Sequence, residues 1–381
     1  MVSISTNIPY FFDVLSENLP GDIIFDIFIR LPVKSLCRFK CVSKSMYSML
    51  HSSNFIKKHI NRAMQKDLSM ILRTEFRLYA AAEEEDEKRS KVRKLQVPFA
   101  SSLEKIEILG SCNGLLCISD QQRNEDIFIY NPSTGVHRKL PVPEFDIPTI
   151  ESTCLTSLGF GFHQNDYKLL RSVYLYDKPF QNMDSYECEA RIYSFSTNNW
   201  RKIGKIPFHI SSRAAIMFHN NFVWKASKGF VRGMLVPVVA FDLDKEEFWE
   251  VPRPEIANPE EGQIEVGVFE GRFSIYHMWK SDRVEIWTME EFGVKHSWRK
   301  LFVIRPKLAM DEGFVYLKPL LMMRNGKILI EMCEGHLILY DPGTKTAINF
   351  KIQGAPIWFQ VTSFVSSLVS PFTTRAENES G

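Results

Sequence analysis

The most constraining feature of the chain is the segment LPGDIIFDIFIRLPVKSLCRFKCVSK at positions 19–44. Pro20 favours the start of a helix, because its missing N–H would have no intrahelical partner. Four apolar residues then recur at helical spacing, namely Ile23, Ile24, Ile27 and Phe28. Pro32 predicts the end of this helix, since proline disfavours helical geometry in the preceding residue. The segment therefore predicts a compact helical unit with too few apolar residues to form a domain alone.

Two further helices complete the predicted unit. Apolar residues of the second are Val33, Leu36 and Phe39, and those of the third are Val42, Met46, Met49 and Leu50. Residues from Phe55 to about Lys66 finish the module. An amphipathic helical hairpin at a domain edge would give a similar apolar stripe, but it would not give this ordered pattern over some forty residues.

This pattern resembles the F-box: LP, then I-x-x-x-I, then RLPVKSL-x-R-x-K-x-VSK. One departure is Met46, where plant F-boxes usually carry tryptophan. A flexible methionine can fill the same gap, so we expect the third helix to form.

The resemblance implies a docking function. An F-box buries apolar surface against the Skp adaptor of a Skp–cullin–F-box ubiquitin ligase, and through it reaches the cullin. The residues that match core or adaptor-contact positions of the motif are Leu19, Pro20, Ile23, Ile27, Leu31, Pro32, Leu36 and Val42. The sequence alone does not decide which of them face inward.

Composition limits the remaining possibilities. The 381 residues suffice for one small module and one large domain, and 45% apolar content indicates a substantial core. A net charge of +2 gives no electrostatic case for nucleic acid. The seven cysteines include no C-x-x-C and no zinc-like spacing, so we predict free thiols in a reducing compartment and neither metal nor cofactor.

Targeting signals are equally sparse. Apolar runs fall short of the roughly 18 residues of a membrane span. The N-terminus lacks a basic region before its apolar residues, so we do not predict a signal peptide. These features predict a cytoplasmic or nuclear protein, or one present in both compartments.

The predicted domains are an F-box at 15–60, a linker at 61–100, a large β domain at 101–370 and a disordered tail at 371–381. Within the linker, LSMILRTEFRL at 68–78 reads as an isolated strand. The charged run AAAEEEDEKRSKVRK at 80–94 reads as a solvated loop.

A repeat organises the β domain. Its units are IFIYNPSTGVHRKLP, RIYSFSTNNWRKIGKIP, VAFDLDKEEFWEVPRP, VEIWTMEEFGVKHSWRKLFVI and LILYDPGTKTAINFKI. Trp200, Trp249 and Trp298 recur 49 residues apart, so we expect equivalent and largely buried positions for them. A period of about 45–50 residues is typical of propeller blades, and the segment has space for about six. An all-β sandwich with similar hairpins is the alternative.

The predicted ring needs a closure. Strands near Ile71 and Val361 lie outside the clear repeats, and we expect them to pair because an open ring would leave unpaired edges. The predicted fold class is thus α+β, a small helical F-box followed by a large all-β, kelch-like propeller of about six blades.

The β domain also resembles plant F-box-associated domains, through GSCNGLLCI, YNPSTG, GFGFHQNDYKLL, FDLDKEEFWEVP and NGKILIEMCEGHLILYDP in this order. IWTMEEFGVKHSWRKLFVIRP and SSLVSP further resemble S-locus F-box proteins. This resemblance implies a client protein marked with ubiquitin for degradation, possible clients being the S-RNases of pollen self-incompatibility.

The residues point to binding and not to catalysis. Gly159 and Gly161 lie in a predicted strand without the helix that a phosphate site needs. His163 and His277 near strand ends are more often packed or solvated residues than ligands. We therefore predict a non-catalytic receptor. A plant receptor for an immune, hormonal or developmental protein, or a propeller scaffold not engaged with a ligase, stays open.

Two segments are candidate client-binding loops. The run 83–94 has opposed charge blocks that could orient a charged partner. The segment DKPFQNMDSYE at 177–187 has aromatic residues among polar ones, and its candidate contacts are Asp177, Phe180 and Tyr186. Alternatively, both are ordinary surface loops.

Overall fold

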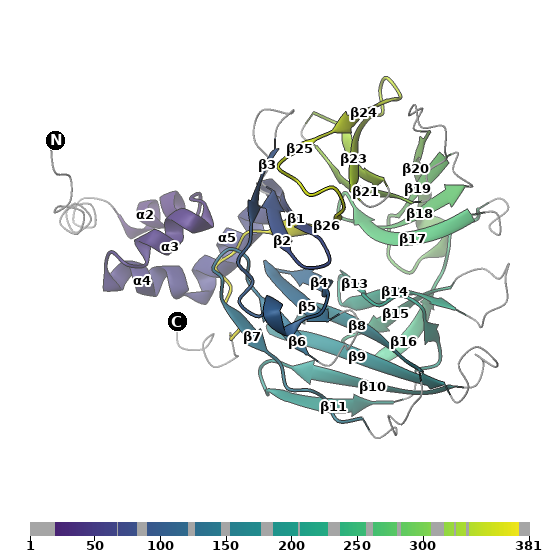
Figure 1. The fold of residues 1–381 in the computed structure, drawn as a ribbon, viewed down its shortest axis with the longest axis horizontal. Coiled ribbons are helices and arrows are strands. Elements are labelled where there is room, and N and C mark those ends of the chain that lie inside the picture. Colours follow the sequence, from purple (N-terminus) through teal and green to yellow (C-terminus); the bar gives the residue numbers. More distant parts are fainter. Residues whose placement is uncertain are drawn as a thin grey trace.

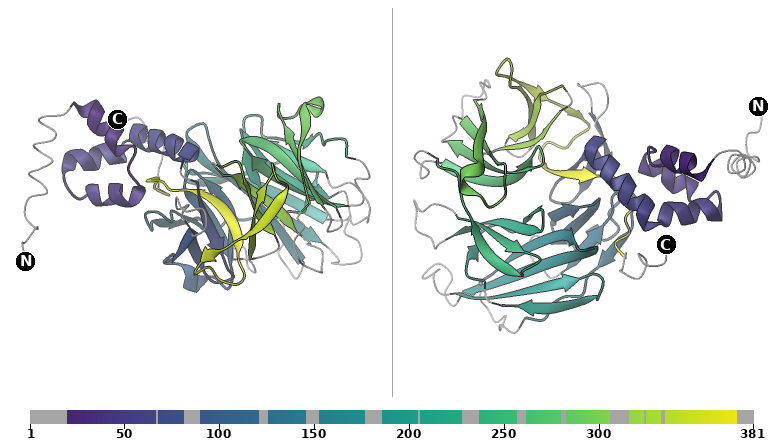
Figure 2. Two further views of the ribbon diagram at one scale, coloured as in Figure 1. Left: turned by 90° about the horizontal axis from the view of Figure 1, so that it is seen from above. Right: turned by 180° about the vertical axis from the view of Figure 1, so that it is seen from behind.

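The computed structural model describes residues 20–66, 68–81, 90–120, 126–145, 153–176, 186–204, 206–227, 237–256, 262–279, 283–305, 316–323, 325–332 and 335–372. Four helices come first: α2 (Gly21–Phe28), α3 (Val33–Phe39), α4 (Lys44–His51) and α5 (Ser53–Lys66). They lie to one side of a ring of six β-sheets (Figures 1 and 2).

Five sheets follow one another along the chain as blades 1 to 5. Blade 1 contains β4 (Ile106–Cys112), β5 (Leu115–Asp120), β6 (Ile127–Tyr130) and β7 (His137–Lys139). Blade 2 contains β8 (Thr153–His163), β9 (Asp166–Tyr176), β10 (Tyr186–Ser194) and β11 (Asn199–Ile203). Blade 3 contains β12 (His209–Ile210), β13 (Ile216–Phe218), β14 (Asn221–Ser227), β15 (Val238–Asp242) and β16 (Glu247–Val251). Blade 4 contains β17 (Gly262–Phe269), β18 (Arg272–Trp279), β19 (Arg283–Met289) and β20 (Trp298–Ile304). Blade 5 contains β21 (Leu317–Met322), β22 (Ile328–Met332), β23 (His336–Asp341) and β24 (Thr346–Phe350).

Blade 6 is built from both ends of the ring domain. Its strands run in the order β25 (Ile352–Gln353), β3 (Ser90–Lys94), β2 (Leu78–Ala81), β1 (Leu68–Arg73) and β26 (Gln360–Val365). Antiparallel pairing sets Ile71 opposite Thr362 and Leu72 opposite Val361. The predicted closure and the prediction of about six blades are therefore confirmed.

Two predictions for the segment before residue 101 are wrong. Residues 68–78 are not one isolated strand, because a turn at 74–77 separates β1 from β2. The charged run is not wholly a loop, because Ala80 and Ala81 belong to β2 and residues 90–94 form β3. The ring domain thus begins inside the predicted linker, since three strands in register supply blade 6. Residues 82–89 lie outside the described part of the chain.

Each junction between neighbouring blades has its own apolar core. The junction of blades 1 and 2, for example, buries side chains from both sheets, including Leu115, Cys117, Ile129, Leu158, Phe160, Leu169 and Tyr193. Five further cores join the remaining neighbours around the ring. Both faces of each sheet are therefore buried, which explains why the second and third strands are almost continuously apolar.

The two faces of the ring differ in their connections. We call the face where β1 begins and β26 ends the proximal face, and the opposite one the distal face. The proximal face carries tight turns, such as Asn113–Gly114 with φ of +51° and +79°. Such a two-residue turn requires positive φ at both positions, which Asn and Gly tolerate best. The longer connections, including 140–152, 252–261 and 305–316, leave strands at the distal face.

Most turns between third and fourth strands repeat one polar device. A side-chain oxygen accepts hydrogen bonds from backbone N–H groups two and three residues ahead, at Asn131, Asp242 and Asp341. The fourth residue after each of these has positive φ, namely Gly135, Glu246 and Lys345. Such Asx turns replace backbone hydrogen bonds that the hairpin itself lacks.

The three evenly spaced tryptophans are not all equivalent, so that prediction is wrong in part. Trp200 lies opposite Tyr193 and Trp298 opposite Met289, and each indole donates to a proline carbonyl of the preceding blade, Pro141 and Pro252. Trp249 lies opposite Ala240, one residue farther from its turn than Phe248.

A shift of one residue turns a side chain to the other face of a strand. Phe248 packs against the preceding blade, as Trp200 does, whereas Trp249 faces the following blade. Trp298 is buried, but Trp200 and Trp249 are only half-buried.

We predict that Trp298→Ala lowers the free energy of unfolding by about 3–5 kcal/mol, because it empties a buried aromatic site. Trp200→Ala should cost less, since part of this side chain already lies in water. Urea unfolding followed by far-ultraviolet circular dichroism measures both. Equal losses for the two variants would contradict the difference in burial.

Candidate functional site

The helical module has a core of its own. Its buried side chains are Phe28, Val33, Leu36, Met46, Leu50, Phe55 and, from the far end of the chain, Leu368. Phe28 meets Phe39 edge-on with ring centroids 5.0 Å apart. Met46 is buried, and α4 begins at a Ser43 cap whose hydroxyl accepts the Met46 N–H at 3.2 Å. The third predicted helix therefore forms with methionine in place of tryptophan.

Helix α2 has two apolar faces. Ile24 and Phe28 pack into the core, whereas Ile23 and Ile27 are 46% and 47% exposed. The i, i+4 spacing brings each pair onto one side of the helix. The outer side of α2 therefore presents two neighbouring apolar side chains to solvent.

The other predicted adaptor-contact residues divide in the same way. Pro20 and Pro32 are exposed at the starts of α2 and α3. Leu31 and Val42 are half-buried beside the module core, and Leu36 is completely buried within it. Leu19 lies outside the described residues. Leu36 can thus act on an adaptor only by holding the helices in place.

The distal face of the ring carries the most exposed large apolar side chains among the described residues. Ile357 is 84%, Trp358 67% and Phe76 62% exposed. Ile357 and Trp358 precede β26, and Phe76 follows β1, so both segments leave paired strands at the same end. Of the seven tryptophans, only Trp358 is exposed. We call Phe76, Ile357 and Trp358 the distal apolar patch.

Ion pairs surround the distal ends of the inner strands. Arg213 Nη2 lies 2.8 Å from Glu107 Oε2, and Lys225 pairs with Glu265. Burial raises the pKa of Glu107, and Arg213 and Arg73 partly offset this shift. Arg73 also donates to the Ile106 carbonyl at 2.6 Å, which ties blade 6 to blade 1.

The described strand ends beside the two predicted client loops lie on opposite faces of the ring. Asp177 and Phe180 lie outside the described residues, and Tyr186 begins β10 at the distal face. Within the run 83–94, residues 90–94 form β3, and the residues before them, outside the described part of the chain, follow the end of β2. Those strand ends belong to the proximal side, because Ala81 lies opposite Met70 near the start of β1.

The two histidines singled out in the sequence, His163 and His277, are buried within the ring. His163 is buried, with its Nε2 2.9 Å from an Asp244 carboxylate oxygen. His277 is completely buried opposite Glu285 in β19, and burial lowers its pKa. Across the described ranges, no three His, Cys, Asp or Glu side chains come together as metal ligands would. No helix in the same ranges is long and apolar enough to cross a bilayer.

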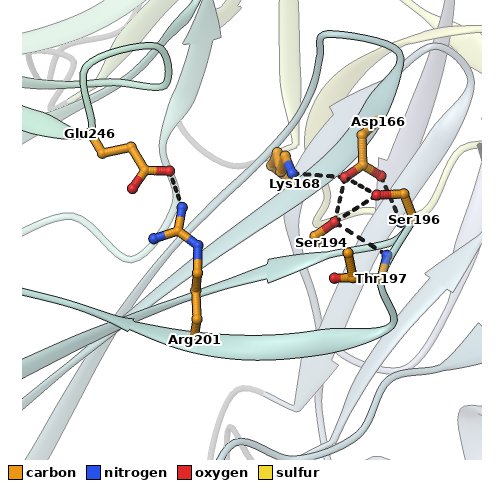
Figure 3. Close-up of polar contacts among 7 residues, drawn as sticks. All are labelled: Asp166, Lys168, Ser194, Ser196, Thr197, Arg201 and Glu246. Carbon is orange, nitrogen blue, oxygen red and sulfur yellow. Dashed lines mark hydrogen bonds and ion pairs between the residues drawn. The ribbon is translucent and has the colours of Figure 1, made fainter.

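A buried carboxylate braces blade 2 on the proximal side (Figure 3). Ser194 stands where other blades have Asn131, Asp242 or Asp341, so the turn lacks its own side-chain carbonyl or carboxylate oxygen. Asp166 in β9 supplies it, and accepts from the Ser196 N–H at 2.9 Å, the Ser194 hydroxyl at 2.5 Å and Lys168 Nζ at 2.7 Å. Burial raises the pKa of Asp166, but the Lys168 and serine hydrogen bonds outweigh it and hold the pKa below 3.8. In the same view Arg201 of blade 2 pairs with Glu246 of blade 3.

Comparison with known protein families identifies the two parts of the chain. An F-box domain matches residues 16–58, and an F-box associated beta propeller domain matches residues 63–371. The chain is an F-box protein of the F-box-associated propeller family. The predicted resemblance to F-box proteins with an F-box-associated domain and the predicted fold class are thereby confirmed, and the propeller match begins within the predicted linker.

Curated relatives match most of the chain at low identity. The F-box protein At3g07870 of Arabidopsis thaliana is 29% identical and covers 92% of each chain. The F-box protein CPR1 of the same plant is 29% identical, over 92% of this chain and 88% of its own. Among solved structures, an oligogalacturonate lyase from Vibrio parahaemolyticus covers 76% of this chain and 80% of its own, with 10% identity and a TM-score of 0.43. A likeness of that size supports no statement about chemistry.

Sequence reasoning on this F-box protein missed two features. The distal apolar patch was not predicted, although IWF at 357–359 places two large apolar residues beside a third in a segment that precedes the last strand. Leu368 in the F-box core left no signal, because some 300 residues separate it from the helices.

The Asp166 cluster predicts a pH-dependent stability. Because the folded pKa is depressed, the ionised carboxylate stabilises the fold above the ordinary value of 3.8, and this stabilisation is lost as the pH falls through the folded pKa. Asp166→Asn should therefore cost about 1–3 kcal/mol at neutral pH, and the gap to wild type should narrow below the ordinary pKa. Urea unfolding at a series of pH values measures this gap.

Asp26→Asn is the matched control, since Asp26 forms an exposed i, i+4 ion pair with Arg30 on α2. The free energy of unfolding of Asp26→Asn should stay within about 0.5 kcal/mol of the wild-type value at any pH. A gap between wild type and Asp166→Asn that stays constant down to acidic pH would refute the role of the ionised carboxylate.

Proposed function

We propose that this protein is the substrate-recognition subunit of a Skp–cullin–F-box ubiquitin ligase. The observation that carries the proposal is the exposed Ile23 and Ile27 pair on a helix whose opposite face completes the F-box core. The helices bind the Skp adaptor and through it the cullin, and the ring binds a client protein.

The adaptor interface centres on α2. Burying an isoleucine stabilises a complex by about 1.5–3 kcal/mol, so two adjacent ones supply a substantial anchor. Pro20 and Pro32 extend this surface, Leu31 and Val42 border it, and Leu36 supports it from the core. Leu19, outside the described residues, stays a predicted contact. Central apolar anchors of this kind dominate the affinity of most interfaces.

The client interface lies on the distal face. The F-box is joined to the proximal face through α5, which leaves the distal face open to a second protein. The distal apolar patch offers a tryptophan, the residue type most enriched at interface hot spots. Its partner is an apolar segment of the client. Tyr186 begins β10 at the same face and is a further proposed contact. Asp177 and Phe180, outside the described residues, stay predicted contacts.

The protein acts without chemistry of its own. It holds a client near a ubiquitin carrier and raises the effective concentration of client lysines, which speeds transfer by proximity. Such a subunit needs neither metal nor cofactor and works in the cytoplasm, the nucleus or both.

The class of client protein is the most specific part of the proposal. The segments that resemble S-locus F-box proteins make S-RNases the first candidates. Propeller loops vary freely on a fixed scaffold, so the same architecture suits a receptor for an immune, hormonal or developmental protein.

Replacing Ile23 and Ile27 together by Asp should weaken adaptor binding at least about a hundredfold, because two apolar anchors become charges that stay hydrated. Calorimetric titration of the purified adaptor measures the affinity. Ile348→Asp is the matched control, since Ile348 in β24 is 56% exposed and distant from the helices. Binding of the double variant at wild-type affinity would refute the adaptor interface.

The distal patch has its own test. Trp358→Ala with Ile357→Ser should lower client ubiquitination about tenfold or more while adaptor affinity stays unchanged. The assay is reconstituted ubiquitination of a panel of S-RNases and unrelated plant proteins. Modification of another protein but of no S-RNase would reject the narrow client class. A client modified equally by wild type and variant would reject the patch. Replacement of residues 177–187 by a Gly/Ser linker tests the predicted loop in the same assay.

A further inference from the structure

The segment 366–369, which we call the C-terminal clamp, follows directly after the closing strand β26. Its Leu368 is buried in the F-box core together with residues of α2, α3, α4 and the start of α5. This core is small, so one leucine is a large share of its apolar content. The C-terminal part of the chain passes beside α5 in each view (Figures 1 and 2).

The next residue of the clamp points into a different core. Val369 is buried between blades 1 and 2, where it joins Ile60 of α5. Adjacent residues of one extended segment point to opposite sides. The clamp therefore lies between the F-box and the ring and contributes one side chain to each.

Hydrogen bonds fix the clamp to blade 1. Asn131 is completely buried, and its side-chain amide donates to the carbonyls of Ser367 at 3.1 Å and Val369 at 2.7 Å. The Ser367 hydroxyl donates to the Asn113 carbonyl at 2.8 Å. The turn beside it leaves no space for a side chain, since a Cβ on Gly114 would lie 2.2 Å from the Ser367 hydroxyl oxygen. Buried polar groups with several good partners hold one conformation.

We propose that Leu368 is a positioning residue for adaptor binding. The F-box reaches its adaptor-binding form only when closure of the ring places the C-terminal clamp, with Leu368, in the F-box core. The inference rests on the proposed function for its adaptor. Leu368 does not face the Ile23 and Ile27 surface; it completes the core against which α2 packs. Because β26 closes the ring three residues earlier, closure and completion of the F-box core are one event. A chain that stops before β26 would have neither.

The C-terminal clamp also fixes the orientation of the F-box relative to the ring. Helix α5 joins the two parts through one chain connection, at residue 67, and packs Ile60 against the ring. The clamp adds a second, and two connections restrict rotation more than one. The adaptor face and the distal face are thereby held in a fixed relation, which proximity-driven transfer needs.

The first experiment compares full-length Leu368→Ala, Leu368→Met and wild type. Apparent affinity falls in proportion to the fraction of protein in the binding-competent form. Leu368→Ala should weaken adaptor binding by about tenfold or more, and Leu368→Met, which refills the site, should restore most of it. Hydrogen exchange should rise in α2, α3 and α4 of Leu368→Ala, but not in β17 to β20 of blade 4.

Two further variants act from the ring side. Asn131→Asp keeps the oxygen that caps its own turn but removes both donors to the clamp, so it should weaken adaptor binding in the same direction. Asp341→Asn is its matched control, because Asp341 caps the equivalent turn in blade 5 with no bond to the clamp. Removal of residues 366–381 should abolish adaptor binding, whereas removal of 373–381 alone should not change it.

The inference is overturned if Leu368→Ala binds the adaptor as wild type does and protects α2, α3 and α4 equally. It is also overturned if exchange rises as much in blade 4 as in the helices, since the leucine would then support the whole fold. If wild type itself does not bind the adaptor, the proposed function fails. The exchange comparison still decides whether Leu368 holds the F-box.

Discussion

The pairing of β1 with β26 is the interaction on which the rest of this protein depends. It joins residues 68–73 to residues 360–365, so the first and last strands of the ring share one sheet. Without it, the two inner strands at the junction would expose unpaired backbone groups, and two of the six apolar cores would lose one side. A contact between such distant residues has a high loop-closure cost, which the many buried apolar side chains of blade 6 must offset.

Ring closure also determines where the docking surfaces lie. The strand that closes the ring leads into the distal apolar patch at its start and into the C-terminal clamp at its end. One strand thus links the proposed client face with the F-box core. Residues 357 and 358 precede β26 and residue 368 follows it, so all three depend on the same antiparallel pairing for their positions.

The blades share one strand order but differ in how their turns are capped and in where their aromatic side chains lie. Blades 1, 3 and 5 cap a proximal turn with their own Asn or Asp, whereas blade 2 takes the acceptor from Asp166 on a neighbouring strand. The tryptophans vary in a similar way. Phe248 occupies in blade 3 the site that Trp200 has in blade 2, and Trp249 one residue later contacts the following blade. The equal spacing of the three tryptophans in the sequence therefore does not give them equivalent positions, because a shift of one residue along a strand turns a side chain to the opposite face.

The sequence by itself determined the elements whose signals are local. Helical spacing and two prolines predicted α2 and α3, turn residues and apolar strands predicted the blades, and the LP and VSK pattern resembled the F-box. Only the tertiary structure decided which apolar residues of α2 face outward, that residues 68–81 and 90–94 belong to the ring, and that Leu368 completes the F-box core. These outcomes depend on partners hundreds of residues away, and a side chain's periodicity tells which face it occupies but not what covers that face.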